Sequence, residues 1–497
     1  MPGVLDNILR IPTMPSTSSG FRSNAHTMLS IIVLSFFLLL MLAAMVLFAG
    51  NNLTTGLLLI LSPGFLIAAI WMLVKPHFGV VAIMFANFFS IGISRYVNLP
   101  TGLMVDGFLG LTLVGIFFSQ LHTKVEWKNA FRDFTYLVVF WMFMTTAQLL
   151  NPEVASRTAW IYAMRSMALY SVIIVPVVYL IYNKPKDMMS FIYLSGWFTL
   201  LAILKGVQQK FIGPDPWEQR WLEIPGNQTT HVLFGIIRVF SFFADAGTYG
   251  GMMAYFGVVF LILAIHLKVS AGKKLFFWLV ALGSFYAMAI SGTRSAVAVP
   301  FVGFFVYAFL TKNFKAMFFT AIFLFFAVFI LRYTQIGESI YEIRRMRTVF
   351  QTDEPSLKVR EENRALFRKY LESRPFGGGV GSAGNWGLRF SPGTFLAQTP
   401  TDGWYIQVWV EQGIVGLVFY LFMILYFAGK AGVLILFKIK DNNFRFTAIA
   451  FLAGAFGIMV SSYSASTLGQ MPGTILFFMS MCFISLMPEW EKNNLTL

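Results

Sequence analysis

The sequence contains few charged residues and a single cysteine, and both shortages limit what the protein can be. Only 12% of its 497 residues are charged, whereas 57% are hydrophobic, a composition that soluble domains of this length do not show. Because Cys482 is the only cysteine, disulfides within the chain are excluded. The sequence also lacks two aspartates one residue apart and any His, Cys and carboxylate cluster in its polar segments, so we expect no catalytic metal and no other cofactor.

The positive charge of the chain does not indicate binding to nucleic acid. The formal net charge is +15, but the basic residues are dispersed in short segments between apolar runs instead of being gathered on one soluble surface. Membrane topology explains this distribution better. The lipid bilayer is therefore an expected partner and nucleic acid is not.

Apolar runs of roughly 20 residues, the length that crosses a bilayer as a helix, recur along nearly the whole chain. They predict an all-α polytopic membrane protein with about fourteen transmembrane helices and no second, soluble domain. The run from Met28 to Gly50 is too long for the core of a signal peptide, so it is interpreted as an uncleaved first span. The expected spans are 28–49, 53–74, 78–97, 103–121, 134–150, 160–182, 188–211, 249–267, 275–291, 296–311, 315–332, 403–429, 446–464 and 471–487.

Every second short loop is rich in Lys and Arg, which are retained in the cytoplasm. This alternation predicts that both termini lie in the cytoplasm and that the active face lies on the outer side of the membrane. The expected regions are a cytoplasmic tail (1–27), an N-terminal bundle (28–211), spans with outward-facing arginine segments (212–332), an outer helical loop between the eleventh and twelfth helices (333–402), C-terminal spans (403–487) and a cytoplasmic tail (488–497).

The loop at 333–402 is long enough to indicate a function. Its segment EPSLKVREENRALFRKYLES predicts an amphipathic helix that begins near Pro355 and ends at Pro375. The expected apolar face carries Val359, Leu366 and Tyr370. Arg360, Arg364 and Arg368 form a basic stripe on another face. Within this stripe, Arg360 is a candidate catalytic residue and Arg364 a candidate for substrate binding.

Three arginines from different segments, Arg238, Arg294 and Arg360, are expected at the outer membrane boundary. The positive-inside rule does not require arginine there. Guanidinium groups bind phosphate oxygens bidentately and keep their charge when partly buried, so the three arginines predict an anion site suited to a diphosphate. The alternative is that each of them only snorkels to the interface from a helix end.

Two side chains are candidates for a general base. Among the five histidines, only His231 is expected on the outer side, so any outward imidazole base must be His231. Asp402 stands at the start of the twelfth span, where partial desolvation would make a carboxylate more basic. The alternatives are an interfacial histidine and a helix-capping aspartate.

Further candidates lie within spans and in a glycine-rich turn. Asp106 and Lys205 are ionisable residues in predicted spans, so they either line a substrate groove or pair structurally. The run GGGVG includes Gly378 and Gly379, whose backbone amides could cradle an anion if the run is more than an ordinary turn. This run is not followed by the Lys and Ser or Thr of a P-loop, so nucleotide binding is not predicted.

Four segments between Arg238 and Tyr420 resemble the O-antigen polymerase and ligase family, which comprises membrane glycosyltransferases that use undecaprenyl-diphosphate-linked glycans. These segments are RVFSFFADAGTYGG, SGTRSA, SLKVREENRALFRKYLESRPFGGGVG and TDGWYIQVWVEQGIVGL. They follow the family's order around a long outer loop. The N-terminal half of the chain is similar only in its generic apolar spans.

The resemblance implies a protein of the bacterial inner membrane whose active face and long outer loop are periplasmic. It also implies metal-independent, inverting glycosyl transfer at that face, in a GT-C-like multi-helix fold whose loop covers a cavity open to lipid. It implies diphosphate binding by Arg294 and Arg360, with Arg238 as a third candidate. Asp402 stands where ligases of the family carry His followed by Asn, and this departure favours a polymerase with a carboxylate base.

The expected activity is polymerisation of lipid-diphosphate-linked oligosaccharide repeats into a surface polysaccharide. The expected partners are the undecaprenyl-diphosphate-linked donor, a glycan acceptor, and flippase, chain-length or export proteins. The first alternative is a ligase that moves the glycan to a lipid or protein acceptor. The second is a transporter or flippase for a lipid-linked sugar, although repeated halves with ionisable groups at mid-membrane would be more typical of that class.

Overall fold

The structure is a computed structural model. It describes residues 41, 43, 45, 53–97, 100–224, 227, 231–233, 235–312, 314–339, 341–347 and 355–497. The chain divides into two compact units, residues 1–70 and 71–497. All the candidate site residues belong to the second unit, and the description below concerns that unit.

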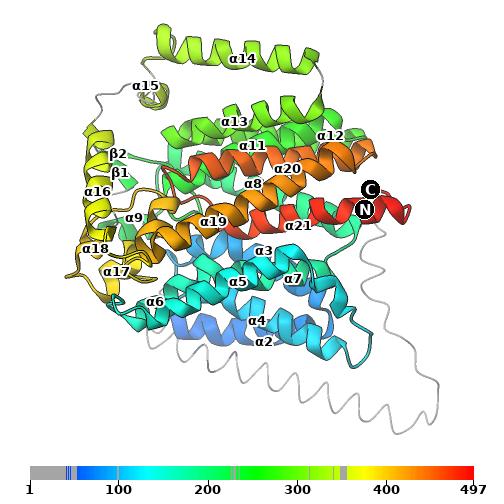
Figure 1. The fold of residues 1–497 in the computed structure, drawn as a ribbon, viewed down its shortest axis with the longest axis horizontal. Helices are drawn as coiled ribbons and strands as arrows, with labels where there is room; N and C mark the ends of the chain where they lie inside the picture. Colours follow the sequence, from blue (N-terminus) through cyan, green and yellow to red (C-terminus); the bar gives the residue numbers. More distant parts are fainter. Residues whose placement is uncertain are drawn as a thin grey trace. The chain divides into compact units, whose positions relative to one another are not determined.

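Helices dominate the described residues, which confirms the all-α fold of a polytopic membrane protein (Figure 1). Within the described residues, ten helical stretches are long and apolar enough to cross a membrane. Eight of them are single helices: α3 (Pro76–Ile93), α8 (Pro185–Phe211), α11 (Ala246–His266), α12 (Ala271–Ile290), α13 (Arg294–Thr311), α19 (Trp404–Phe437), α20 (Asn442–Ser461) and α21 (Gly473–Lys492). The other two are composite: α5 (Asp133–Ala147) with η2 (Gln148–Leu150), and α6 (Arg157–Met164) with the π-helical η3 (Arg165–Leu169) and α7 (Tyr170–Ile181).

The structure describes nine further helices. They are α2 (Leu53–Val74), α4 (Leu103–Ser119), η1 (Trp127–Ala130), α9 (Pro216–Glu223), α14 (Phe314–Tyr333), α15 (Tyr341–Arg347), α16 (Pro355–Leu371), α17 (Gly384–Phe390) and α18 (Phe395–Gln398). The strands described are β1 (Val232–Leu233) and β2 (Ile236–Ile237), which form a small antiparallel hairpin.

Each expected span from 53–74 onward coincides with a helix of the structure, with shifted ends. The expected span 28–49 lies outside the described residues apart from three positions. The total of fourteen spans, the sidedness and the region boundaries remain predictions. The twelfth expected span, 403–429, is longer than predicted, because α19 continues to Phe437.

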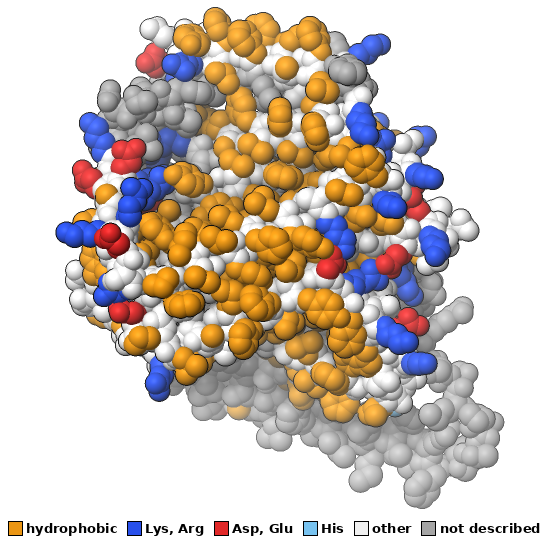
Figure 2. Space-filling view, in the orientation of Figure 1, with side chains coloured by type: hydrophobic (Ala, Val, Ile, Leu, Met, Phe, Trp, Pro, Cys, Tyr) orange, Lys and Arg blue, Asp and Glu red, His pale blue; other side chains and the backbone are white. Residues whose placement is uncertain are grey.

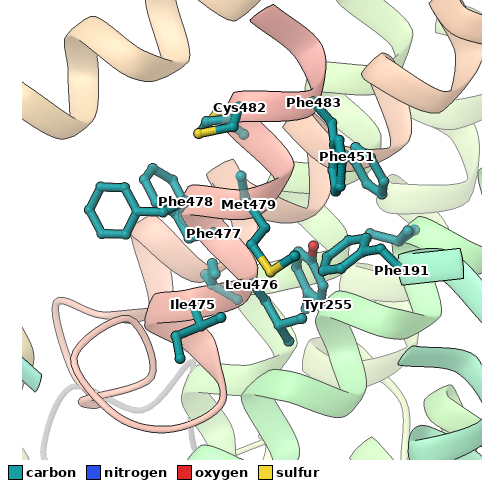
Figure 3. Packing of buried hydrophobic residues seen from close by; sticks show 14 of the residues in the cluster. Phe191, Tyr255, Phe451, Ile475, Leu476, Phe477, Phe478, Met479, Cys482 and Phe483 are labelled. Atoms are coloured by element: carbon teal, nitrogen blue, oxygen red, sulfur yellow. The ribbon is translucent and has the colours of Figure 1, made fainter. Parts of the chain in front are cut away.

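Three helices, α11, α20 and α21, are the most buried of the candidate spans. Their side chains pack with those of α8 in a continuous aromatic core (Figure 3). The ring of Phe191 from α8 lies 5.8 Å from that of Phe451 in α20 and 5.4 Å from that of Phe483 in α21. Small residues permit this close packing: a Cβ at Gly454 would lie 2.7 Å from the ring of Tyr255.

Hydrophobic side chains cover the middle of the face shown in Figure 2, whereas charged side chains gather at its two ends. One charged end holds α16, α17, α18, α9 and the β1–β2 hairpin in Figure 1. An apolar band between two polar ends is the pattern that a bilayer imposes on a multi-pass protein.

The non-helical backbone of Gly413 divides α19 into residues 404–412 and 414–437. At 1.5 Å per residue the second part alone spans about 36 Å, whereas the hydrocarbon core is about 30 Å thick. Part of α19 must therefore extend beyond the apolar core. Its first turns pack against polar α16 and against α18, with Phe367, Leu371, Leu396 and Val410 in a small separate core. We call α16, α17, α18 and residues 404–413 of α19 the headpiece.

The structure confirms the helix predicted after Pro355 but corrects its apolar face. Phe367 and Leu371 are the buried residues, whereas Val359 and Leu366 are about half exposed. Tyr370 packs only at the edge of the headpiece core. The helix turns this face inward because Phe367 and Leu371, four residues apart, meet Val410 of α19 and Leu396 of α18.

Candidate active site

The short turn between α12 and α13 brings the first two predicted arginines together. Gly292 has a φ of +58°, which lets the chain reverse tightly before Arg294 opens α13. The Thr293 hydroxyl donates to the carbonyl of Ala246 at 2.7 Å, which ties the turn to the start of α11. Arg238 donates from Nη2 to the same hydroxyl at 3.4 Å. Arg238 and the residue next to Arg294 are therefore in contact, although 55 positions separate them.

Arg294 also lies within electrostatic reach of Arg360 on α16 and of Arg345 on α15. The side chain of Arg345 passes Gly292, where a Cβ would lie 3.5 Å from its Cδ. The structure thus groups the three predicted arginines with a fourth, Arg345, which the sequence interpretation missed. The basic run RRMR in the long polar loop is the signal that could have indicated it.

Asp402 lies beside this arginine group. Its Oδ1 is 3.9 Å from Nε of Arg360, and its Oδ2 is 3.5 Å from the amide nitrogen of Asn363. The Asp402 and Arg360 side chains are 30% and 27% exposed, so both can reach a ligand. One carboxylate thus adjoins a surface of several guanidinium groups.

The backbone conformation of Asp402 is unusual. Its φ is +52°, a region that residues other than glycine seldom occupy and that is enriched at functional sites. The N-cap of α19 is Gly403, and no side chain caps it. The capping alternative for Asp402 therefore has no support in the structure, and the side chain is left facing Arg360.

Arg364 contacts a different neighbour. It donates from Nη1 to the Tyr463 hydroxyl at 2.7 Å, and its guanidinium lies 4.4 Å from the centroid of that ring. The carbonyl of Tyr463 packs against Gly403, so Tyr463 links Arg364 to the residue that follows Asp402. The predicted role of Arg364 in substrate binding remains a prediction.

The imidazole ring of His231 is held by contacts with the backbone. Its Nδ1 is 2.8 Å from the carbonyl of Asn227, and its Nε2 is 3.0 Å from that of Ala244. The ring is buried edge-on against Trp221 and Phe240, and burial lowers the pKa of His231. Both ring nitrogens face backbone carbonyls, and the role of His231 as a base remains a prediction.

The two ionisable residues in spans do not pair with each other. Lys205 lies 2.7 Å from Asp215 and 3.0 Å from Glu218, at the start of α9. Asp106 instead pairs with Arg165 at 2.7 Å. Asp215 and Glu218 also form the reciprocal cap that begins α9. Lys205 therefore anchors α9 to α8, and its predicted contact with substrate is not tested.

Arg95 was also missed by the sequence interpretation, and it holds the segment that follows Arg238. It donates to the carbonyls of Ser241, at 2.5 Å, and Phe243. Its guanidinium also lies 4.4 Å from the ring centroid of Phe240. Burial lowers the pKa of Arg95 to about 10, so it stays charged at neutral pH.

The glycine-rich turn is tied to the headpiece by backbone hydrogen bonds. The amide of Gly378 donates to the carbonyl of Val410, and that of Gly379 donates to the carbonyl of Glu411, both at 2.9 Å. These two amides are therefore already used, and an anion would have to displace them. The structure favours the alternative that the turn at Gly378 and Gly379 is architectural.

Together, the fold and the site define a multi-pass membrane protein with an arginine-rich site and one adjacent carboxylate at one end of its bundle. Residues 275–421, from α12 to the middle of α19, match the family model described as O-antigen ligase. This match supports assignment of the protein to the O-antigen polymerase and ligase family, as the resemblance indicated. The family implies an enzyme that transfers a glycan from a lipid-linked donor to an acceptor.

The matched segment contains Arg294, Arg345, Arg360 and Asp402, whereas Arg238 lies before it. No curated protein matches the chain at a significant level.

Proposed function

We propose that the protein polymerises oligosaccharide repeat units, carried on undecaprenyl diphosphate, into a surface polysaccharide at the periplasmic face of the inner membrane. The observation that carries this proposal is the position of Asp402 beside Arg360, in a group of arginines drawn from three separate segments. A glycosyl transfer from a lipid diphosphate needs both functions: a base for the acceptor and cations for the leaving group.

In the proposed reaction, Asp402 accepts the proton of the acceptor hydroxyl as its oxygen attacks the anomeric carbon of the donor sugar. The bond between that carbon and the diphosphate oxygen breaks, and its electron pair leaves with the lipid diphosphate. Attack from the side opposite the leaving group inverts the anomeric configuration. No metal is required if the guanidinium groups stabilise the departing diphosphate.

The arginines can supply a large share of this stabilisation. A close pair of opposite charges contributes on the order of 4 kcal/mol at an effective dielectric near 20, before desolvation is counted. Because Arg294 and Arg360 come from different elements, they can approach a diphosphate from two sides. Asp402 would then act at the edge of the same site, where the anomeric carbon meets the acceptor.

A ligase that transfers the finished glycan to a separate acceptor is the second candidate, since the matched family model is described as O-antigen ligase. The two activities share the donor, the leaving group and the base. They differ only in whether the acceptor is another lipid-linked repeat. Asp402 in place of the ligases' His and Asn favours the polymerase.

The test is gel analysis of glycan length after purified, lipid-reconstituted protein is incubated with its undecaprenyl-diphosphate-linked repeat as the sole substrate. We expect a ladder from the wild type and its loss, by about 100-fold or more, in Asp402→Asn. Arg294→Ala and Arg360→Ala should also abolish it. Glu362→Gln is the matched control, because Glu362 is an exposed carboxylate on the same headpiece.

Each other result points to a different conclusion. Transfer only to an added acceptor would identify a ligase. Lipid-linked sugar flipping without transfer would identify a transporter. A ladder that persists in Asp402→Asn would exclude this carboxylate as the base.

A further inference from the structure

The short helix α15 carries several basic side chains and is fixed on the bundle from two sides. Glu342 is buried and forms an ion pair with Lys210 near the end of α8. Arg347 donates to the carbonyls of Thr334 and Ile336, at and beyond the end of α14. These contacts hold α15 against the end of the bundle where the candidate site lies (Figure 1).

The orientation of α15 separates two neighbouring arginines. Arg344 is exposed, whereas Arg345 is partly buried and passes Gly292 in the turn before Arg294. The charge of Arg345 acts on Arg294, as does that of Arg360. The side chain of Arg345 therefore lies beside the turn that leads to Arg294, and its charge acts there, whereas Arg344 is exposed.

Gathering like charges has an electrostatic cost in the absence of an anion. A diphosphate reverses this cost, because each added guanidinium then makes an attractive, charge-assisted contact. A site with cations from α13, α15 and α16 could surround a diphosphate instead of touching only one of its phosphates.

We propose that Arg345 binds the diphosphate of the lipid-linked donor, and that the Lys210–Glu342 ion pair positions it. This inference rests on the proposed function. Arg345 would contact the ligand directly, whereas Lys210 and Glu342 would act through the placement of α15.

The experiment measures binding of undecaprenyl diphosphate to the full-length protein in nanodiscs, without any sugar or acceptor. The Arg345→Ala variant loses one charge-assisted contact, so it should bind undecaprenyl diphosphate roughly 10- to 100-fold more weakly than the wild type does. Arg344→Ala, one position away on the same helix, should stay within about twofold of the wild type, because an exposed charge contributes little. If the Arg345→Ala variant binds undecaprenyl diphosphate as tightly as the Arg344→Ala variant does, the inference is wrong.

The positioning pair is tested by exchanging its charges. Lys210→Glu and Glu342→Lys should each weaken diphosphate binding, and the double variant should recover most of it, while thermal unfolding confirms that each protein is folded. No recovery in a folded double variant would refute the positioning role.

The binding experiment also separates this inference from the proposed function. Diphosphate binding that depends on Arg345, in a wild type that makes no glycan product, would support the inference and overturn the proposed function. A folded wild type that does not bind undecaprenyl diphosphate would overturn both.

Discussion

Gly413 is the position where a single added methyl group should do the most damage to the headpiece. It lies inside α19 with φ +68° and ψ −171°, a non-helical conformation that breaks the helix. A Cβ on Gly413 would overlap the carbonyl oxygen of Pro375, and one on Gly377 would overlap the amide nitrogen of Gly413. The segment around Gly377 and the segment around Gly413 therefore cross with their backbones in direct contact.

The cost of Gly413→Ala has two parts. The backbone region that Gly413 occupies is almost restricted to glycine and costs another residue about 1–3 kcal/mol. Overpacking against a backbone that cannot rotate away adds about 1–3 kcal/mol. We therefore expect the headpiece to lose about 2–6 kcal/mol of stability, with the turn at Gly377 displaced from α19.

The assay is thermal unfolding of the purified protein together with limited proteolysis of the 355–403 region. Gly429→Ala is the matched control, because Gly429 lies in the same helix with nothing within 4 Å of its added Cβ. Gly429→Ala should be neutral or slightly stabilising. If Gly413→Ala unfolds and is cleaved like Gly429→Ala, the backbone crossing is not as tight as described.

Two further predictions concern buried polar groups. Lys205→Met leaves the almost fully buried Glu218 without the ammonium group that pairs with it. This substitution should lower the free energy of unfolding, measured by denaturant titration, by about 3–5 kcal/mol. A loss below about 1 kcal/mol would contradict the prediction. Because burial lowers the pKa of His231, the unfolded state binds a proton that the folded state does not as the pH falls below about 6.5. Stability should therefore decrease from pH 7 to pH 5, and less steeply in His231→Gln; equal slopes in thermal unfolding would refute this.

The membrane helices could be predicted from the sequence because the signal is local. A run of apolar residues long enough to cross a bilayer needs no knowledge of its neighbours. The apolar face of α16 was predicted wrongly because the burial of its residues depends on contacts with other elements, which the local sequence does not contain. Leu366 and Phe367 are adjacent, and only the positions of Val410 and Leu396 decide which of them is buried.

The arginine group could be predicted only in part. Arg238, Arg294 and Arg360 were selected because their segments should share one side of the membrane, which topology alone can indicate. Arg345 and Arg95 were missed because their importance depends on contacts across the fold. The Lys210–Glu342 pair joins residues 132 positions apart, and no periodicity in the sequence records such a contact.

The headpiece connects the two chemical requirements of the proposed reaction. One end of α16 supplies Arg360 to the arginine group and places it beside Asp402. The other end leads into the turn that is locked at the Gly413 break in α19. The distance between the base and the leaving-group site is therefore set by how α16 is fixed on α19. A substitution that loosens the turn, far from any reacting atom, should consequently reduce glycosyl transfer as well as stability, because a shift of about 1 Å at a reacting centre can cost about 100-fold in rate.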